Sequence, residues 1–259
     1  MGVYTDHVVP RIINVACGMK AANELRERIC SGLKGHVVEI GFGSGLNVPY
    51  YPPAVSAVAA IEPSDVGWSL GSKRLANATV PIKRSGLDGQ RLPFDDDTFD
   101  AVMATVTVHQ WRDTTVGLTE LRRVSRGPVV VLTFDGDELD RFWLADYAPE
   151  LIAAERRRYP AIATVAAAIG RLTEVREVPI PIDCVDGFTE AYYARPEAFL
   201  DPHVRAAQSA WGFITPEATK RAVDRLRSDL TSGRWQQTYG HLLTQPQFTG
   251  SLRLLVGRP

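Results

Sequence analysis

The feature that most constrains this chain is a short apolar stretch that runs into three alternating glycines. Residues 37–40 read Val-Val-Glu-Ile, and residues 41–45 read Gly-Phe-Gly-Ser-Gly. A short apolar run bounded by glycine predicts a buried strand. Glycine permits the sharp turn that must follow, and it lets a ligand lie against bare backbone. We therefore expect a strand, a turn and a ligand-binding loop over residues 36–45.

The residues around the glycines narrow the choice of ligand. A phosphate-binding loop needs backbone N–H groups and positive charge, whereas Glu39 favours a ligand that is cationic or rich in hydrogen-bond donors. The dinucleotide fingerprint G-x-G-x-x-G needs a small residue where Leu46 stands. No Lys followed by Ser or Thr completes a phosphate loop. A glycine turn that binds nothing remains an alternative.

Charge and cysteine content exclude several functional classes. The chain of 259 residues has 29 Lys and Arg against 30 Asp and Glu, so its formal charge of −1 argues against nucleic acid or an acidic membrane as partner. The three scattered cysteines predict neither a disulfide framework nor a zinc site. No apolar run reaches transmembrane length, and the N-terminal stretch lacks the pattern of a signal peptide. We expect a cytoplasmic protein without a metal, and the sequence makes no prediction about its oligomeric state.

Strand and helix patterns alternate along the first half of the chain. Apolar runs predict further strands at 54–61, 80–84, 99–108 and 128–134, and helical patterns lie between them at 64–76 and 113–125. This alternation is typical of a parallel sheet with helices on both faces. Later apolar patterns at 175–182 and 251–256 predict two more strands. The expected fold is α/β, a Rossmann-like, seven-stranded, mostly parallel sheet.

Acidic residues follow two of these strands. Glu62, followed by Pro63, ends the second strand, where a β-α-β unit places a carboxylate that accepts hydrogen bonds from ribose hydroxyls. Asp88 and Gly89 follow the third strand and precede Leu-Pro-Phe at 92–94. Asp-Gly is also a common turn sequence.

Together, residues 39–45, Glu62 and the run at 88–100 resemble the motifs of class I S-adenosylmethionine-dependent methyltransferases. Gly89 and Gln90 replace the Ala and Glu usual in that family. The resemblance covers residues 35–135 and is closest to the small-molecule group that includes the ubiquinone and menaquinone biosynthesis enzymes. It implies that S-adenosylmethionine is the cofactor and that its binding residues are Glu39, Gly41, Gly43, Gly45, Glu62, Pro63, Asp88, Gly89 and Thr105.

Two irregular regions predict a helical cap. Segments 135–160 and 185–245 carry mostly helical patterns, including a helix at 138–147, and they leave the fifth and sixth strands. Ligands of open parallel sheets bind outside the carboxyl ends of the strands, so both segments emerge on the cofactor side. We predict one domain, in which 1–35 forms an N-terminal helical cover, 36–134 the cofactor-binding core and 246–259 the final strand.

The aromatic residues of these segments predict a small apolar or aromatic acceptor. Packing within the cap's own core is the alternative interpretation. The residues expected to bind the acceptor are Trp111, Trp143, Tyr147 and Tyr193.

His109 is the candidate general base, because it follows the fourth strand and an unperturbed histidine pKa of ~6.5 leaves the ring able to accept a proton. A purely structural role for His109 is the alternative. The expected reaction is in-line methyl transfer to a small acceptor. Two other functions stay open: a non-catalytic S-adenosylmethionine-binding protein, and an NAD(P)-binding oxidoreductase.

Overall fold

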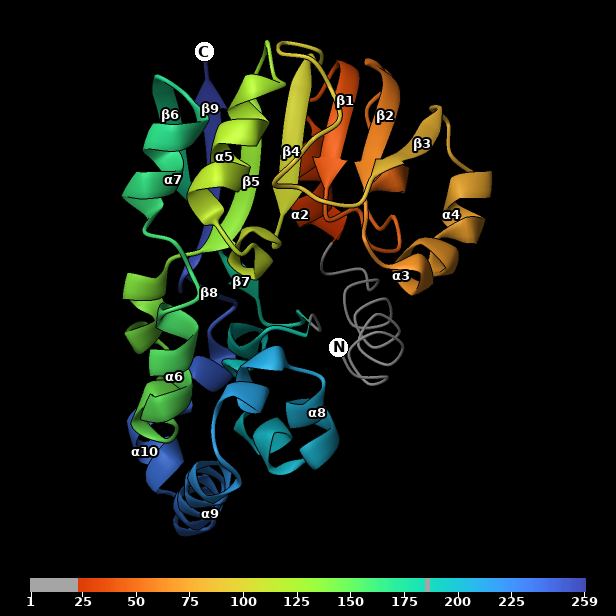
Figure 1. Cartoon of the computed structure of the whole chain (residues 1–259). Coiled ribbons are helices and arrows are strands. Elements are labelled where there is room, and N and C mark those ends of the chain that lie inside the picture. The colour runs from red at the N-terminus through yellow and green to blue at the C-terminus, as the bar shows by residue number, and fades with distance from the viewer. Residues whose placement is uncertain (1–22, 185–186) are drawn as a thin grey trace.

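The computed structural model describes residues 23–184 and 187–259, which form a seven-stranded sheet, helices on both of its faces and a group of helices at one edge (Figure 1). The strand order is β3-β2-β1-β4-β5-β9-β6. Neighbours are parallel except at β9, which is antiparallel to β5 and to β6. The predicted mostly parallel α/β sheet is confirmed. The strands are β1 (Gly35–Ile40), β2 (Val55–Ile61), β3 (Ile82–Gly86), β4 (Ala101–Thr105), β5 (Val129–Phe134), β6 (Leu172–Glu177) and β9 (Leu252–Arg258).

The centre of the sheet is apolar on both faces. Every residue of β5 and the first four residues of β4 are buried. Strands that lie between two helical layers need apolar side chains on both sides. At the edge of the sheet, every residue of β6 except Thr173 is exposed. The continuous apolar runs that predicted the central strands therefore reflect burial from both sides.

Helices from different parts of the chain cover the two faces. Leu118 and Leu121 of α5 pack with Val165 and Ile169 of α7 on one face, and α2, α3 and α4 lie on the other face. The helix predicted at 64–76 is divided at Gly71. A Cβ at this position would lie 2.8 Å from the Ser44 carbonyl oxygen of the glycine loop, so the close contact requires glycine. The helices are α2 (Asn23–Cys30), α3 (Asp65–Leu70), α4 (Ser72–Ala76), α5 (Thr114–Arg123) and α7 (Ile162–Ile169). Residues 1–22 of the predicted N-terminal cover lie outside the described residues.

The chain after β5 and after β6 forms the cap, on the side to which the arrowheads of the parallel strands point (Figure 1). Its core is aromatic, and the Trp143 ring lies 5.0–5.8 Å from the rings of Phe142, Tyr147, Phe199 and Trp235. The elements of the cap are η5 (Gly136–Arg141), η6 (Trp143–Asp146), α6 (Pro149–Arg156), η7 (Thr189–Tyr192), η8 (Pro196–Leu200), α8 (Pro202–Ala206), η9 (Ser209–Phe213), α9 (Pro216–Ser232), α10 (Arg234–Tyr239) and η10 (Gly240–Thr244), where η marks a 3₁₀ helix.

Two more predicted elements are wrong in detail. The helix expected at 138–147 is the pair η5 and η6, separated by Phe142 in an extended conformation with ψ of 128°. The strand expected at 175–182 is divided into β6 and the short β7 (Ile180–Pro181), which pairs with β8 (Gln247–Phe248) in a separate ribbon. Pro179 lies between β6 and β7 and has no N–H to donate to a ladder.

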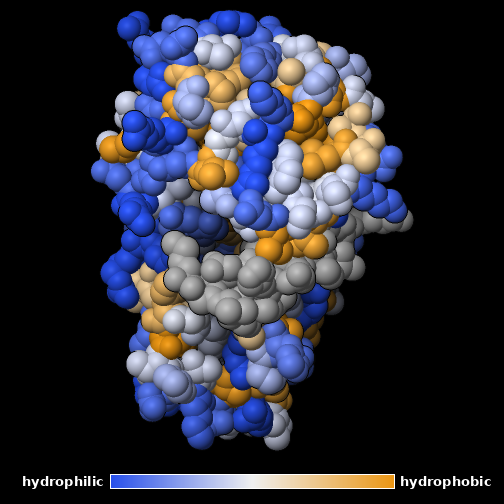
Figure 2. Space-filling model, turned by 45° about the vertical axis from the view of Figure 1, so that its right-hand side comes forward, coloured by the Kyte–Doolittle hydropathy of each residue, from blue (hydrophilic) through white to orange (hydrophobic). Residues whose placement is uncertain are grey.

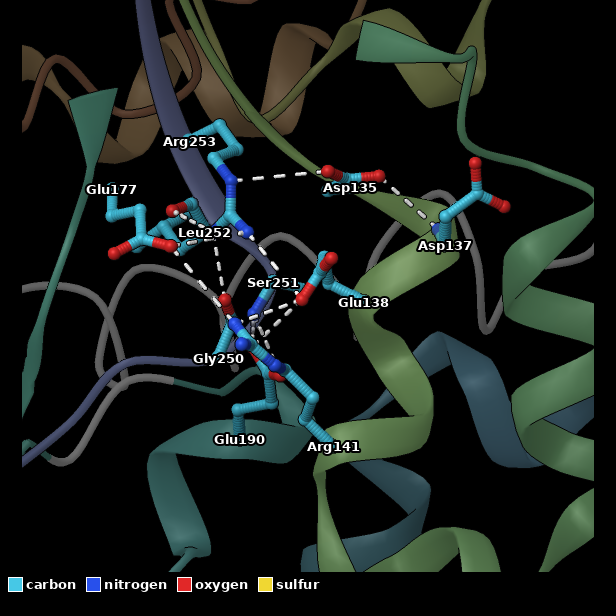
Figure 3. A network of polar contacts seen from close by, with 10 residues as sticks. All are labelled: Asp135, Asp137, Glu138, Arg141, Glu177, Glu190, Gly250, Ser251, Leu252 and Arg253. Atoms are coloured by element: carbon cyan, nitrogen blue, oxygen red, sulfur yellow. Dashed lines mark hydrogen bonds and ion pairs between the residues drawn. The ribbon is translucent and has the colours of Figure 1, made fainter. Parts of the chain in front are cut away.

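A buried polar network joins the cap to the sheet (Figure 3). The Glu190 carboxylate of η7 accepts hydrogen bonds from the Ser251 backbone N–H (3.0 Å) and from the Ser251 hydroxyl (2.8 Å). Arg253 of β9 lies beside it, and its guanidinium is 3.8 Å from carboxylate oxygens of Asp135, Glu138 and Glu177. The start of β9 therefore fixes η7 and η5 against the carboxyl edge of the sheet.

On the face drawn in Figure 2, hydrophilic residues surround separate hydrophobic patches. Within the described residues, no helix combines the length and the apolar character that crossing a membrane requires.

Candidate active site

The glycine loop follows β1 and has the sharp turns expected for it. Gly41, Gly43 and Gly45 have φ values of 73°, 58° and 70°, in the left-handed region that favours glycine. A Cβ at Gly41 would lie 2.8 Å from Thr107, and one at Gly45 would lie 3.0 Å from the Phe42 ring. At Gly43 the nearest atom would be 3.9 Å away. The loop is therefore closely packed at both ends and open beside Gly43.

Glu62, directly after β2, faces this loop. Its carboxylate accepts hydrogen bonds from the backbone N–H groups of Gly43 (2.6 Å) and Ser64 (2.7 Å), and only 6% of the residue is exposed. A carboxylate has about four lone-pair positions, so Glu62 keeps the capacity to accept from further donors. The two backbone bonds hold the side chain at the edge of the loop. Pro63, predicted to bind the cofactor, is exposed beside it.

Glu39 turns toward the protein interior. It accepts hydrogen bonds from Asn47 Nδ2 (2.7 Å) and from the Tyr51 hydroxyl. Asn47 in turn accepts from Arg26 of α2 at 2.7 Å. Burial raises the pKa of Glu39 to about 7, although both hydrogen bonds act to lower it. The carboxyl group thus joins the loop to α2, and its contact with a cofactor stays a prediction.

Asp88 and Gly89 reach the loop from the other side. A Cβ at Gly89 would lie 2.5 Å from Ile40, the last residue of β1, and 3.5 Å from the Trp111 indole nitrogen. Asp88 is exposed and accepts from the Gln90 N–H at 2.9 Å. The structure thus places Gly89, from the run at 88–100, against the end of β1, which leads into the glycine loop. Trp111 lies beside it.

The end of β4 completes this edge of the sheet. The Thr105 hydroxyl oxygen is buried and has no hydrogen-bond partner among the described residues. Val106 has a φ of 50°, which is rare for a β-branched residue. This turn places Thr107 against Gly41. The end of β4 therefore contacts the loop through Thr107, two residues after the unpaired Thr105 hydroxyl.

His109 lies in η4 (Val108–Gln110), directly after β4. Burial lowers its pKa to about 4, and the charge of Arg158 adds to this effect. The Nδ1 atom is buried and lacks a hydrogen-bond partner within the described part of the chain. The imidazole is therefore neutral at pH 7 and has an unused polar atom.

An aromatic row extends from His109 to the cap, and it consists of His109, Tyr159, Phe134 and Phe188. Successive ring centroids in this order are 5.1, 5.3 and 5.3 Å apart. The Tyr159 hydroxyl donates to Glu155 (3.0 Å), and burial raises the Tyr159 pKa well above its ordinary value. Tyr159 therefore stays protonated and hydrogen-bonded to α6.

A cavity of about 400 Å³ lies at the far end of the aromatic row. Phe188 lines it together with Leu252 at the start of β9, and α2 contributes Leu25 and Arg28. Leu252 pairs with Phe134 across β5 and β9, so the cavity lies at the carboxyl edge of β5. Five of the other lining residues are of apolar type, namely Val178, Pro179, Ile180, Pro181 and Cys184, and Glu24 and Gln247 add polar groups.

Three of the four residues expected to bind the acceptor lie in the cap's own core. Trp143 donates its indole N–H to the Tyr193 carbonyl oxygen (2.9 Å). Tyr147 hydrogen-bonds Asp229 (3.1 Å), and the Tyr193 hydroxyl donates to the Gln245 carbonyl oxygen (2.6 Å). None of these three residues lines the cavity, because their rings and polar atoms are used to hold the cap together. Trp111 lies at the loop instead.

Comparisons with known proteins agree with this geometry. Residues 38–131 match the family model described as "Methyltransferase domain". Phosphatidylethanolamine N-methyltransferase of Cereibacter sphaeroides is 30% identical over 149 residues, which are 48% of this chain and 70% of that protein. The chain belongs to the class I S-adenosylmethionine-dependent methyltransferases. It is therefore a methyltransferase enzyme whose cofactor is S-adenosylmethionine.

A second relative and a solved structure agree with this assignment. Demethylmenaquinone methyltransferase of Streptomyces griseus is 39% identical over 85 residues, 32% of this chain and 36% of that protein, so the match spans about a third of that relative. A crystal structure from Anabaena variabilis, described as a methyltransferase of an antibiotic biosynthesis pathway, has a TM-score of 0.71 at 24% identity. The match covers 95% of this chain and 96% of the Anabaena variabilis chain, and it shows that the two chains share a fold.

Sequence reasoning missed several residues at this edge. Asn47 and Tyr51 hold Glu39, and Tyr159, Phe134 and Phe188 continue the wall beyond His109. Phe134 had a usable signal, because it ends a predicted strand on the ligand side of the sheet. Tyr159 and Phe188 lie in irregular segments, where no periodic pattern marks their position.

Proposed function

We propose that this enzyme transfers the methyl group of S-adenosylmethionine to a small, largely apolar acceptor held in the cavity at the carboxyl edge of β5. The observation that carries the proposal is the aromatic row, which connects the end of β4 with this cavity. A cavity of about 400 Å³ is within the ordinary range for small-molecule sites. Phosphatidylethanolamine and demethylmenaquinone, named as acceptors of the relatives, are also largely apolar.

The residues of the loop fit the cofactor. The open side of Gly43 leaves room for a ligand against bare backbone, and Glu62 keeps lone pairs for ribose hydroxyls. The unpaired Thr105 hydroxyl at the end of β4 offers a further polar contact. We infer that Gly41, Gly43, Gly45, Glu62, Asp88 and Gly89 hold the cofactor, with Pro63 and Thr105 at its margins and Glu39 supporting the loop from beneath.

When bound, S-adenosylmethionine supplies a methyl group on a positively charged sulfur. The protein contributes an oriented acceptor and a dry wall, and orientation can lower a barrier by about 7–11 kcal/mol. Phe134 and Phe188 exclude water along this wall. His109 lies at the other end of the aromatic row, where its buried Nδ1 has no hydrogen-bond partner within the described residues. Its low pKa opposes complete proton transfer to the ring, so an acceptor that needs no deprotonation suits this site best.

Calorimetry with S-adenosylmethionine and S-adenosylhomocysteine tests the cofactor site. We expect binding in the micromolar range and its loss in Gly43→Val, because the branched side chain fills the open space beside the loop. Gly212→Val is the matched control, since a Cβ at Gly212 meets nothing within 4 Å. Normal cofactor binding by Gly43→Val would contradict the assignment of the loop.

Transfer of a labelled methyl group to a panel of acceptors tests the acceptor class. The panel contains apolar metabolites, hydrophilic amines and an RNA transcript. Phe188→Ala should lower turnover of the apolar acceptors and leave cofactor affinity unchanged, whereas Leu172→Ala on the exposed edge strand, with the side chain 71% exposed, should change neither. Preferential methylation of RNA or of hydrophilic amines would refute the proposed acceptor class.

A further inference from the structure

The cap carries a second concave site on its outer surface, here called the cap groove. It has a volume of about 470 Å³ and lies between α8, η9 and the first half of α9. None of its lining residues also lines the cavity at the carboxyl edge of β5. The methyl-transfer site therefore does not account for this groove.

The apolar wall of the cap groove includes two well-buried side chains. Trp211 and Val223 line it, and each is only 7% exposed. The Trp211 ring packs against Phe199, with ring centroids 5.8 Å apart, so the cap core holds this wall in place. The indole N–H of Trp211 has no hydrogen-bond partner within the described residues. The wall is therefore apolar, and the unsatisfied indole N–H is itself buried.

Positive charge dominates the cap groove. Arg205, Lys220 and Arg227 line it together with one carboxylate, Asp224, which leaves a net charge of +2. Lys220 and Arg227 both form ion pairs with Asp224, so two cations share one anion.

The cap core holds Arg205 in place, and the start of a helix adds to the positive field. Arg205 donates to the carbonyl oxygen of Phe199 at 2.5 Å, and its guanidinium lies 5.8 Å from the Trp211 ring. The groove also includes Pro216, the first residue of the 17-residue helix α9, whose N-terminal end carries partial positive charge.

We propose that the cap groove binds an amphiphilic anion, meaning a phosphate or carboxylate group joined to an apolar chain or ring. The anionic group would lie between Arg205 and Arg227, and the apolar part along Trp211 and Val223. A purely structural groove needs no excess of cations, because neighbouring like charges cost free energy. Such an anion occurs either as a free metabolite or as the head group of an anionic lipid.

Isothermal titration with octyl phosphate tests the proposal on the full-length protein. We expect octyl phosphate to bind more tightly than inorganic phosphate, because of its apolar chain, and octylammonium not to bind. Arg227→Gln should weaken octyl phosphate binding by about two- to fivefold, the effect of one exposed ion pair. Asp224→Asn should strengthen octyl phosphate binding by a similar factor, because Asp224 is the one negative charge among the described residues that line the groove.

Two controls separate the cap groove from other sites. Arg221→Gln removes a charge from the same helix outside the groove, where Arg221 pairs with Glu150, and should leave affinity unchanged. Phe188→Ala alters the cavity at β5 and should also leave it unchanged. Equal binding of octylammonium, or shifts of the same sign in Arg227→Gln and Asp224→Asn, would overturn the proposal.

Sedimentation with vesicles identifies the source of the anion. Binding to phosphatidylglycerol vesicles but not to phosphatidylcholine vesicles, weakened by Arg227→Gln, assigns the groove to a lipid head group. Octyl phosphate binding without vesicle binding assigns it to a free anion. If the protein binds neither octyl phosphate nor phosphatidylglycerol vesicles, the proposed anion site is refuted.

Discussion

Replacing Glu190 with glutamine should change how the stability of this protein depends on pH. Glu190 is 2% exposed, and burial raises its pKa from an ordinary 4.5 to about 7. Arg253 lowers this pKa in part, as do the hydrogen bonds from Ser251. Asp135, Glu138 and Glu177 lie near Arg253 and take up part of its charge. The network in Figure 3 therefore offsets only part of the free-energy cost of burying the Glu190 charge.

The size of the effect follows from the pKa difference between the unfolded and folded states. The folded-state pKa is raised, so the stabilising contribution of Glu190 is complete below pH 4.5 and is lost as the pH rises to about 7. Each pKa unit corresponds to about 1.4 kcal/mol, so Glu190 lowers the free energy of unfolding by about 3 kcal/mol across this range. Glutamine has the same shape and does not ionise. Glu190→Gln should thus match the wild type near pH 4.5 and exceed its stability at pH 8 by up to about 3 kcal/mol.

Urea unfolding followed by circular dichroism at pH 4.5 and pH 8 measures this difference. Glu197→Gln, at an exposed position of η8, is the matched control and should show the same difference from the wild type at both pH values. The reasoning is refuted if Glu190→Gln also differs from the wild type by a constant amount. In that case Arg253 and Ser251 would stabilise the charged carboxylate fully.

Four further predictions concern the site and the cap. His109→Gln should lower turnover by less than the ~10²–10⁴-fold typical of a lost general base, because the low pKa of His109 opposes proton transfer to its ring; kinetics beside calorimetry would show this, and a loss within that range with cofactor affinity intact would contradict it. Wild-type turnover should not follow His109 titration between pH 5 and pH 8, because burial lowers its pKa to about 4; a kinetic pKa near 6.5 that disappears in His109→Gln would contradict this. Gly89→Ala should weaken cofactor binding, because a Cβ would lie 2.5 Å from Ile40, and equal affinity in calorimetry would argue against it. Trp143→Ala should lower the free energy of unfolding by about 3–5 kcal/mol in urea titrations, since it empties the cap core, and a loss below about 1 kcal/mol would contradict this.

Some parts of the site were predictable because the information is local in the chain. Some structural features can be recognised from only a few neighbouring residues. Examples are an apolar run, a set of glycines and an acidic residue after a strand. Gly41, Gly43, Gly45 and Glu62 were identified in this way, and the structure places them together. The fold class followed from the order of strands and helices, because a parallel β-α-β alternation permits few arrangements.

Errors arose where tertiary contacts override local pattern. The aromatic residues Trp143, Tyr147 and Tyr193 look the same in sequence whether they line a pocket or fill a core, and only their partners 50 or more residues away distinguish the two. The helix expected at 138–147 became two 3₁₀ turns, although its composition favours a helix. Burial against the rest of the cap decides such segments, since local propensity is worth only tenths of a kcal/mol per residue.

The electrostatics of the site also came only from the tertiary structure. Sequence alone assigned His109 an ordinary pKa. In the structure the ring is buried and contacts Tyr159, and this burial lowers its pKa to about 4. The charge of Arg158 adds to the effect, so the ring is neutral. Glu39 was expected to bind the cofactor, which stays a prediction, and only the fold shows that Asn47 and Tyr51 hold its carboxylate. The sequence by itself determined which chemical groups reach the carboxyl edge of the sheet. Their protonation and their partners depend on desolvation and on contacts between distant segments, which exist only after the chain has folded.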